Sequence, residues 1–145
     1  MALTSDKGYE LTQGMQKLYI SMKPRNFIKG IKPTQMMVMM CVYHNTKDEK
    51  TTTPSVICEE LGLSKSALSA ILNILEEKAL IERHLSSDDR RMLILKLTDG
   101  AINLIGQYHD KIHKSIQEFT EYLGNEDTDE FIRLVNKANK FFAKD

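Results

Sequence analysis

The stretch that decides the fold is Pro54–Lys78, with the sequence PSVICEELGLSKSALSAILNILEEK. Pro54 suits the first position of a short helix, where its missing N–H has no intrahelical partner, and Thr53 before it is a favourable cap. Gly62 interrupts the apolar pattern, and Ser64 is predicted to cap a second helix. Two helices joined by so tight a turn form a helix-turn-helix, the unit that lays its second helix in the DNA major groove.

The second helix divides into two faces. Apolar residues recur at i, i+3, i+4 and i+7 and are predicted to face the core: Leu68, Ile71, Leu72 and Leu75. Small, hydrogen-bonding or cationic side chains, none of them a carboxylate, share the opposite face: Lys65, Ser66, Ser69, Ala70 and Asn73. Glu76 and Glu77 fall at the far end of the helix. Small side chains let a helix approach base edges closely. An ordinary helical hairpin with a solvated polar face has the same periodicity, so this pattern alone does not decide between the two.

A β-hairpin is predicted directly after this unit. Residues Arg91–Leu97 alternate with the period of a strand, and Ile81–Leu85 is the expected first strand. The polar stretch Ser86–Asp89 between them is the expected turn.

Amphipathic helices flank this region on both sides. Before it, one helix is expected to carry Leu11 to Met22 and to stop at Pro24, and another opens at Pro33 and precedes a polar loop, Asn45–Thr52. In the helix that opens at Pro33, the residues expected to point inward are Met36, Met37, Met40 and Val42.

After the hairpin, a long helix is expected from Thr98 and Asp99 to Leu123, ended by Gly124, with a last helix behind it. The apolar stripes of the first helix and the last two are wider than one small domain needs, which is typical of a helical dimer interface. The residues expected to meet a second copy include Tyr9, Leu18, Tyr122, Phe131, Phe141 and Phe142.

Composition restricts the function classes. The 145 residues fit one domain, and no apolar run approaches a membrane span. The absence of a signal-peptide pattern and the presence of two cysteines, expected as free thiols, favour a cytoplasmic protein that does not engage a membrane. Twenty basic and twenty acidic side chains give a net charge of zero, which argues mildly against a nucleic-acid binder. A DNA-binding function therefore depends on where the charges lie.

The segment Asp89–Thr98, DRRMLILKLT, resembles the wing signature of the MarR family of winged helix-turn-helix transcription regulators. The turn Leu61–Ser64 and the pair Leu80 and Ile81 resemble that family at the right offsets. The resemblance implies a mainly α fold with a small β-hairpin wing, in which the winged helix-turn-helix is flanked by N- and C-terminal dimerisation helices. Residues 1–145 then form a single domain, with 33–98 as the DNA-binding lobe and 1–32 and 99–145 as the dimerisation helices.

The same resemblance implies a homodimer that binds double-stranded DNA at a pseudo-palindromic operator, usually as a repressor. Arg91 is expected to enter the minor groove, Asp89 to orient it, and Arg90 to contact phosphate. The full set of expected DNA-binding residues is Thr53, Ser64, Lys65, Ser66, Ser69, Asn73, Arg90 and Arg91.

Two residues depart from the family pattern. Ala79 stands where glycine is frequent, so a positive φ there would strain the backbone mildly. Ala70 stands where the reading helix often has arginine, which removes the strongest guanine reader. Specificity is then expected to depend more on DNA shape and on the wing.

Effector sites are weighed against plainer interpretations. His109 and His113 have a metal-clasping spacing, but no complementary carboxylate and histidine occur where zinc-sensing relatives place them, so no metal or other cofactor is predicted. Cys41 and Cys58 are expected to be buried, inert thiols rather than oxidant sensors.

A methionine wall follows a basic run, and together they would suit a small aromatic or amphipathic anionic effector. Core methionines beside a solvated basic loop are the plainer interpretation. The residues are Met36, Met37, Met39 and Met40, preceded by Lys23, Arg25, Lys29 and Lys32.

An enzyme is not expected, because the sequence has no glycine-rich phosphate loop, nucleophile motif or convincing metal cluster. The alternative class is a winged-helix protein–protein interaction module without DNA binding, for which zero net charge is more natural. Such a module would not require Arg90 and Arg91 at the hairpin tip.

Overall fold

The computed structural model describes residues 6–22 and 28–143. Its elements are α1 (Lys7–Ser21), α2 (Pro33–Lys47), α3 (Pro54–Leu61), α4 (Lys65–Glu77), β1 (Ile81–Leu85), β2 (Leu93–Leu97), α5 (Asp99–Leu123) and α6 (Asn125–Phe142). This order is the predicted one, and the mainly α fold with a β-hairpin wing is confirmed. Pro24, predicted to end the first helix, lies outside the described residues. None of the helices in the described ranges is long and apolar enough to span a bilayer.

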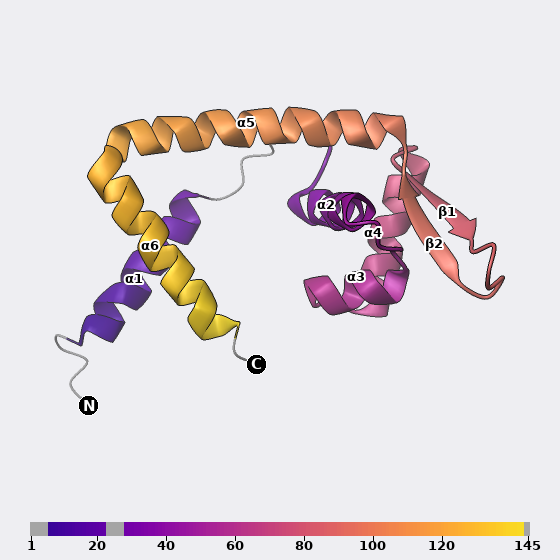
Figure 1. Ribbon diagram of the computed structural model, residues 1–145, viewed down its shortest axis with the longest axis horizontal. Coiled ribbons are helices and arrows are strands. Elements are labelled where there is room, and N and C mark those ends of the chain that lie inside the picture. Colours follow the sequence, from indigo (N-terminus) through magenta and orange to yellow (C-terminus); the bar gives the residue numbers. More distant parts are fainter. Residues whose placement is uncertain (1–5, 23–27, 144–145) are drawn as a thin grey trace.

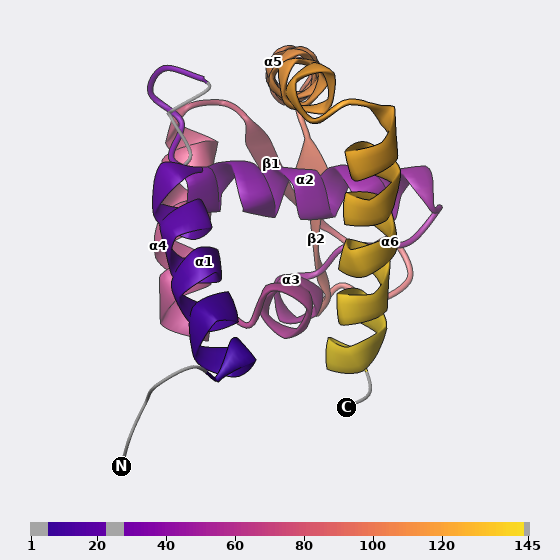
Figure 2. The same ribbon diagram turned by 90° about the vertical axis from the view of Figure 1, so that its left-hand side faces the viewer.

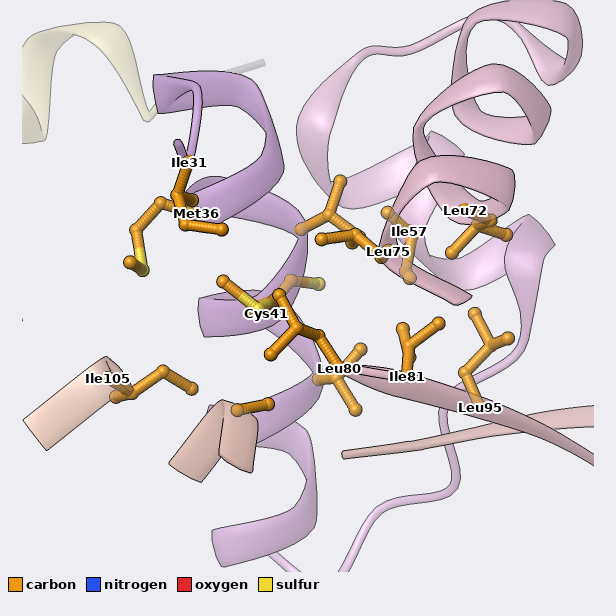
Figure 3. Close-up of a cluster of buried hydrophobic side chains, with 14 of the residues drawn as sticks. Ile31, Met36, Cys41, Ile57, Leu72, Leu75, Leu80, Ile81, Leu95 and Ile105 are labelled. Carbon is orange, nitrogen blue, oxygen red and sulfur yellow. The ribbon is translucent and has the colours of Figure 1, made fainter. Parts of the chain in front are cut away.

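Helices α2, α3 and α4 and the hairpin form a lobe around one core. Figure 3 shows side chains from all of these elements converging, among them Ile57 of α3, Leu75 of α4 and Leu95 of β2. Ile105 of α5 joins the same cluster, so the long helix is anchored to the lobe at its N-terminal end. The predicted inward face of α4 is confirmed, with Leu68, Leu72 and Leu75 buried and Ile71 half-buried.

The two helices of the helix-turn-helix begin and end where the sequence indicates. The Thr53 hydroxyl accepts a hydrogen bond from the Val56 amide at 3.3 Å, and the Ser64 hydroxyl accepts one from the Ala67 amide at 3.1 Å. Gly62 ends α3 in the left-handed conformation, at φ +64°, which a glycine adopts without a Cβ penalty.

The hairpin is a two-stranded antiparallel ribbon in which Ile81 pairs with Leu97 and Leu85 with Leu93. The second strand begins at Leu93 rather than at Arg91 as predicted. The cause is the turn, because the Met92 amide donates to the Asp89 carbonyl at 2.9 Å and the Met92 carbonyl accepts from the Ser86 amide at 2.9 Å. Arg91 therefore lies in the turn.

Two predictions about α2 are wrong. The helix continues to Lys47, so Asn45 is helical and buried rather than part of a loop. Its burial is compensated, because its Nδ2 group donates to both carboxylate oxygens of Glu60 at 3.4 Å. Met37 is 51% exposed and Met39 is fully buried, because the helical period places residue 39 beside residues 36 and 42.

Helix α5 extends away from the lobe, and α6 folds back from its far end (Figure 1). Helices α1 and α6 cross in Figure 1, but the end-on view of Figure 2 separates them on opposite sides. Neither helix contains a buried residue. The apolar faces of α1 and α6 are therefore left uncovered within the described chain.

Candidate DNA interface

The polar face of α4 is exposed from Lys65 to Asn73 and carries no carboxylate over that length, whereas Glu76 and Glu77 lie in the last turn. Its exposed side chains are those predicted: Lys65, Ser66, Ser69, Ala70 and Asn73. Opposite them, the buried leucines fix the helix against α2 and β1, so the polar face points away from the core. The polar face of α4 can therefore present hydrogen-bond donors and small side chains to a binding partner while the packing of the core stays unchanged.

Ser64 and Thr53 combine two features. Each caps the N-terminus of a helix, where unpaired backbone N–H groups and the helix dipole favour an anion. The Ser64 Oγ also lies 3.3 Å from the Ser66 Oγ, and both serines are exposed. Thr53 is half-buried, so capping α3 is its first role.

The hairpin tip presents two exposed cations, Arg90 and Arg91. The Asp89 carboxylate accepts a hydrogen bond from the Arg91 backbone amide at 2.9 Å. The buried Ser86 hydroxyl faces the Asp88 and Asp89 amides at 3.3 and 3.4 Å. Asp89 thus fixes the backbone from which the Arg91 side chain projects, and its predicted action on the guanidinium itself stays a prediction.

Ala79 connects the reading helix to the wing in a left-handed conformation, at φ +54°. Ala79 therefore has the positive φ that the comparison with the family's glycine raised. The Ala79 carbonyl accepts a hydrogen bond from the Thr98 hydroxyl at 2.8 Å, which links this junction to the start of α5.

Arg83 is the residue that sequence reasoning missed. It lies at the centre of β1, and its guanidinium reaches α4, where Nη2 donates to the Asn73 Oδ1 at 2.7 Å. Its Nε lies 3.2 Å from a Glu76 carboxylate oxygen, close enough for an ion pair although the N–H is not aligned for a hydrogen bond. The signal was available, because Arg83 shares an alternating face with the buried Ile81 and so had to find a partner inward.

The residues considered as metal or oxidant sensors have other surroundings. Within residues 6–22 and 28–143, no group of three or more His, Cys, Asp and Glu side chains could hold a metal ion. His109 packs edge-on against Tyr43, with ring centroids 6.1 Å apart.

Cys41 is buried and donates its S–H to Glu60 Oε2 at 2.9 Å. Burial, together with Glu60, raises the pKa of the Cys41 thiol to about 12. The reactive thiolate is therefore disfavoured. Cys58 is half-buried.

Comparison with known proteins identifies this lobe. Residues 29–92 match the family model of the MarR family. The winged-helix lobe belongs to the MarR family. The resemblance seen in the wing sequence is thereby confirmed.

The fold is similar to solved structures along nearly the whole chain. A variant of MepR from S. aureus is 19% identical, with a TM-score of 0.78, over 95% of this chain and 99% of that one. A variant of MarR from E. coli is 22% identical, with a TM-score of 0.73, over 94% and 98%. At these identities the likeness shows the fold.

Two further structures contain bound molecules. Another S. aureus MepR variant, bound to an oligodeoxyribonucleotide, is 20% identical with a TM-score of 0.65, over 92% of this chain and 97% of that one. PcaV from Streptomyces coelicolor, in complex with its natural ligand, is 18% identical with a TM-score of 0.63, over 97% and 96%.

Proposed function

We propose that this MarR-family chain is a sequence-specific regulator that binds double-stranded DNA as a homodimer and acts as a ligand-responsive repressor. One observation carries the proposal: the exposed face of α4 from Lys65 to Asn73, which carries no carboxylate, belongs to the same lobe as a hairpin whose tip exposes Arg90 and Arg91. A chain with no net positive charge needs such a local arrangement to meet phosphates.

In this proposal α4 enters the major groove. Ser66, Ser69 and Asn73 face base edges, where short side chains allow close approach. Lys65 and the helix caps Ser64 and Thr53 meet phosphates at the helix N-termini and set the register. DNA binding as such is supported by a protein of similar fold, because an S. aureus MepR variant has been solved bound to an oligodeoxyribonucleotide.

The wing completes the contact. Arg91 enters the minor groove, where a narrow A·T stretch concentrates negative potential, and Arg90 contacts phosphate. Asp89 holds the backbone of the turn, so the arginine begins from a defined position. The wing then contributes through DNA shape, which compensates for the alanine at position 70.

A second copy of the chain covers the outer helices. Tyr122, Phe141 and Phe142 are 86%, 72% and 72% exposed, more apolar surface than a monomer usually leaves in water. The arrangement of α1 and α6, each without a buried residue, supports a symmetric, intertwined dimer. Two reading helices related by a two-fold axis would recognise a pseudo-palindromic operator.

We also propose that a small molecule controls DNA binding. A small aromatic or amphipathic anion is the expected effector class, and the ligand complex of PcaV supports the general idea. Met36 and Met39 belong to the core, whereas Met37 is exposed and Met40 is half-buried. Of the predicted basic run, Lys29 and Lys32 are exposed, and Lys23 and Arg25 lie outside the described residues.

The proposal is tested by selection from a randomised duplex library, followed by fluorescence anisotropy on the selected duplex between 50 and 200 mM salt. We expect enrichment of a pseudo-palindrome and binding of two chains per duplex. The slope of log affinity against log salt concentration should be about −1 for each phosphate contact. A folded dimer that enriches no sequence and binds no duplex at low salt would favour the protein–protein module instead.

A further inference from the structure

The contact between wing strand and reading helix defines the chemistry of one side chain that faces DNA. We propose that Arg83 is a positioning residue that holds the Asn73 amide by its oxygen, so that Asn73 meets the duplex only as a hydrogen-bond donor. This inference depends on the proposed function, because it concerns the same α4 face.

The orientation of the Asn73 amide follows from the identity of its partner. A guanidinium has only donors, so the amide atom 2.7 Å from the Arg83 Nη2 has to be the oxygen. A charge-assisted hydrogen bond of this length is about twice as strong as a neutral one. Among the described residues, no side chain or carbonyl accepts from the Asn73 amino group, and Asn73 is exposed. The free, outward group of Asn73 is therefore the donor.

Glu76 keeps the arginine in place. Asn73 and Glu76 lie three residues apart, on the same side of α4, and the Glu76 carboxylate is 3.2 Å from the Arg83 Nε. The guanidinium is thus held between two side chains of the reading helix, while its own backbone is paired within the hairpin. The arginine side chain is 29% exposed, so it is partly shielded from water, whereas Asn73 and Glu76 are exposed.

The consequence concerns which acceptor Asn73 can recognise. Asparagine reads adenine through two hydrogen bonds, accepting from N6 with its oxygen and donating to N7 with its amino group. An oxygen already engaged by Arg83 disfavours that pair. The donor suits a partner that only accepts hydrogen bonds. Guanine presents two adjacent acceptors, O6 and N7, where thymine presents O4 alone, so we take the partner to be either guanine or a phosphate oxygen.

The test is a double-mutant cycle on the full-length chain. Wild type, Arg83→Ala, Asn73→Ala and the double variant are each measured on the duplex that wild type selects from a randomised library. Arg83→Ala should weaken binding by about threefold or more in the wild-type background and by much less in the Asn73→Ala background. Lys96→Ala is the matched control, because Lys96 is an exposed cation on the neighbouring strand whose side chain makes no hydrogen bond or ion pair with any described residue. Its effect should be the same in both backgrounds.

Base preference separates the two acceptors. If the acceptor is guanine, wild type disfavours adenine at one position of each half-site, and Arg83→Ala admits it there. If the acceptor is a phosphate oxygen, Arg83→Ala lowers the affinity in a way that depends on Asn73, but the base preference is unchanged.

Arg83→Lys keeps the charge but not the fork that spans Asn73 and Glu76, so it should behave like Arg83→Ala. It also provides a milder variant if Arg83→Ala lowers the helical content.

Three results would overturn the inference. If the effects of Arg83→Ala and Asn73→Ala on affinity simply add, the two side chains are not coupled. If Arg83→Lys binds the duplex as tightly as wild type, only the charge at position 83 matters. Selection of adenine by wild type at the position whose preference depends on Asn73 would contradict the donor assignment. A wild type that selects no duplex would instead refute the proposed function, and this inference with it.

Discussion

Replacing Ala79 by glycine should stabilise the folded chain. Ala79 sits at φ +54°, a conformation that costs an L-residue about 1–2 kcal/mol. Glycine removes that cost but adds about 0.4–1 kcal/mol, because it enlarges the conformational freedom of the unfolded chain. The residue is exposed, so its methyl group contributes little packing, and the Ala79 hydrogen bonds involve only its backbone. The expected net gain is about 0.5–1 kcal/mol.

Thermal unfolding followed by circular dichroism, at fixed protein concentration, measures this change. A gain of that size should raise Tm by about 1–4 °C in a chain of this length. The matched control is Ala70→Gly, the same chemical change at an exposed position in the middle of α4. There glycine should cost about 1 kcal/mol, so the two variants should move Tm in opposite directions. Equal destabilisation by both substitutions would refute the strain at the junction of α4 and β1.

Three further predictions concern other parts of the molecule. Replacing Ser66 and Ser69 by glutamate should abolish duplex binding at unchanged helical content, because both side chains are exposed on α4; specific binding by the folded variant would place another helix in the groove. The Cys41 thiol, with its pKa near 12 against an ordinary 9.0, keeps its proton in the folded chain while the unfolded chain ionises, so stability should fall as pH rises from 9 toward 12. Cys41→Ala should flatten that fall in denaturant titrations, and an unchanged profile would contradict the assignment. Replacing Phe141 and Phe142 by glutamate should give a monomer by light scattering, whereas the exposed control Lys140→Glu on the same helix should stay dimeric.

Much of the fold could be predicted because local chemistry and periodicity agreed. Both ends of α3 and the start of α4 depend on near neighbours only. Thr53 and Ser64 accept cap hydrogen bonds, Gly62 donates its N–H to the Cys58 carbonyl, and the ring of Pro54 presets the first helical φ. The leucines of α4 follow a helical period, and the structure buries them as expected. Such features need no knowledge of distant partners.

The errors arose where a distant partner decides. The polarity of Asn45 favours a loop, but the Glu60 carboxylate, fifteen residues later, accepts hydrogen bonds from its side chain and so compensates its burial in α2. Met37 and Met39 could not be distinguished by composition within a run of methionines, since position on the helix decides which is buried.

The contact of Arg83 with Asn73 joins two elements whose packing had to be known first. The surface that covers the exposed faces of α1 and α6 could not be predicted either, because no part of the described chain packs over these faces.

The measurement that tests the central claim most directly is the salt dependence of duplex binding by wild type and Arg91→Ala, on A·T-rich and G·C-rich flanks. Arg91 is exposed in the turn, so its removal should leave helical content and assembly unchanged. The account predicts that Arg91→Ala weakens binding more on A·T-rich flanks and reduces the slope of log affinity against log salt by about one unit. An equal loss of affinity on both flanks would mean that Arg91 contacts only the phosphate backbone of the DNA. Unchanged binding by the folded variant at low salt would contradict the wing's role in DNA recognition.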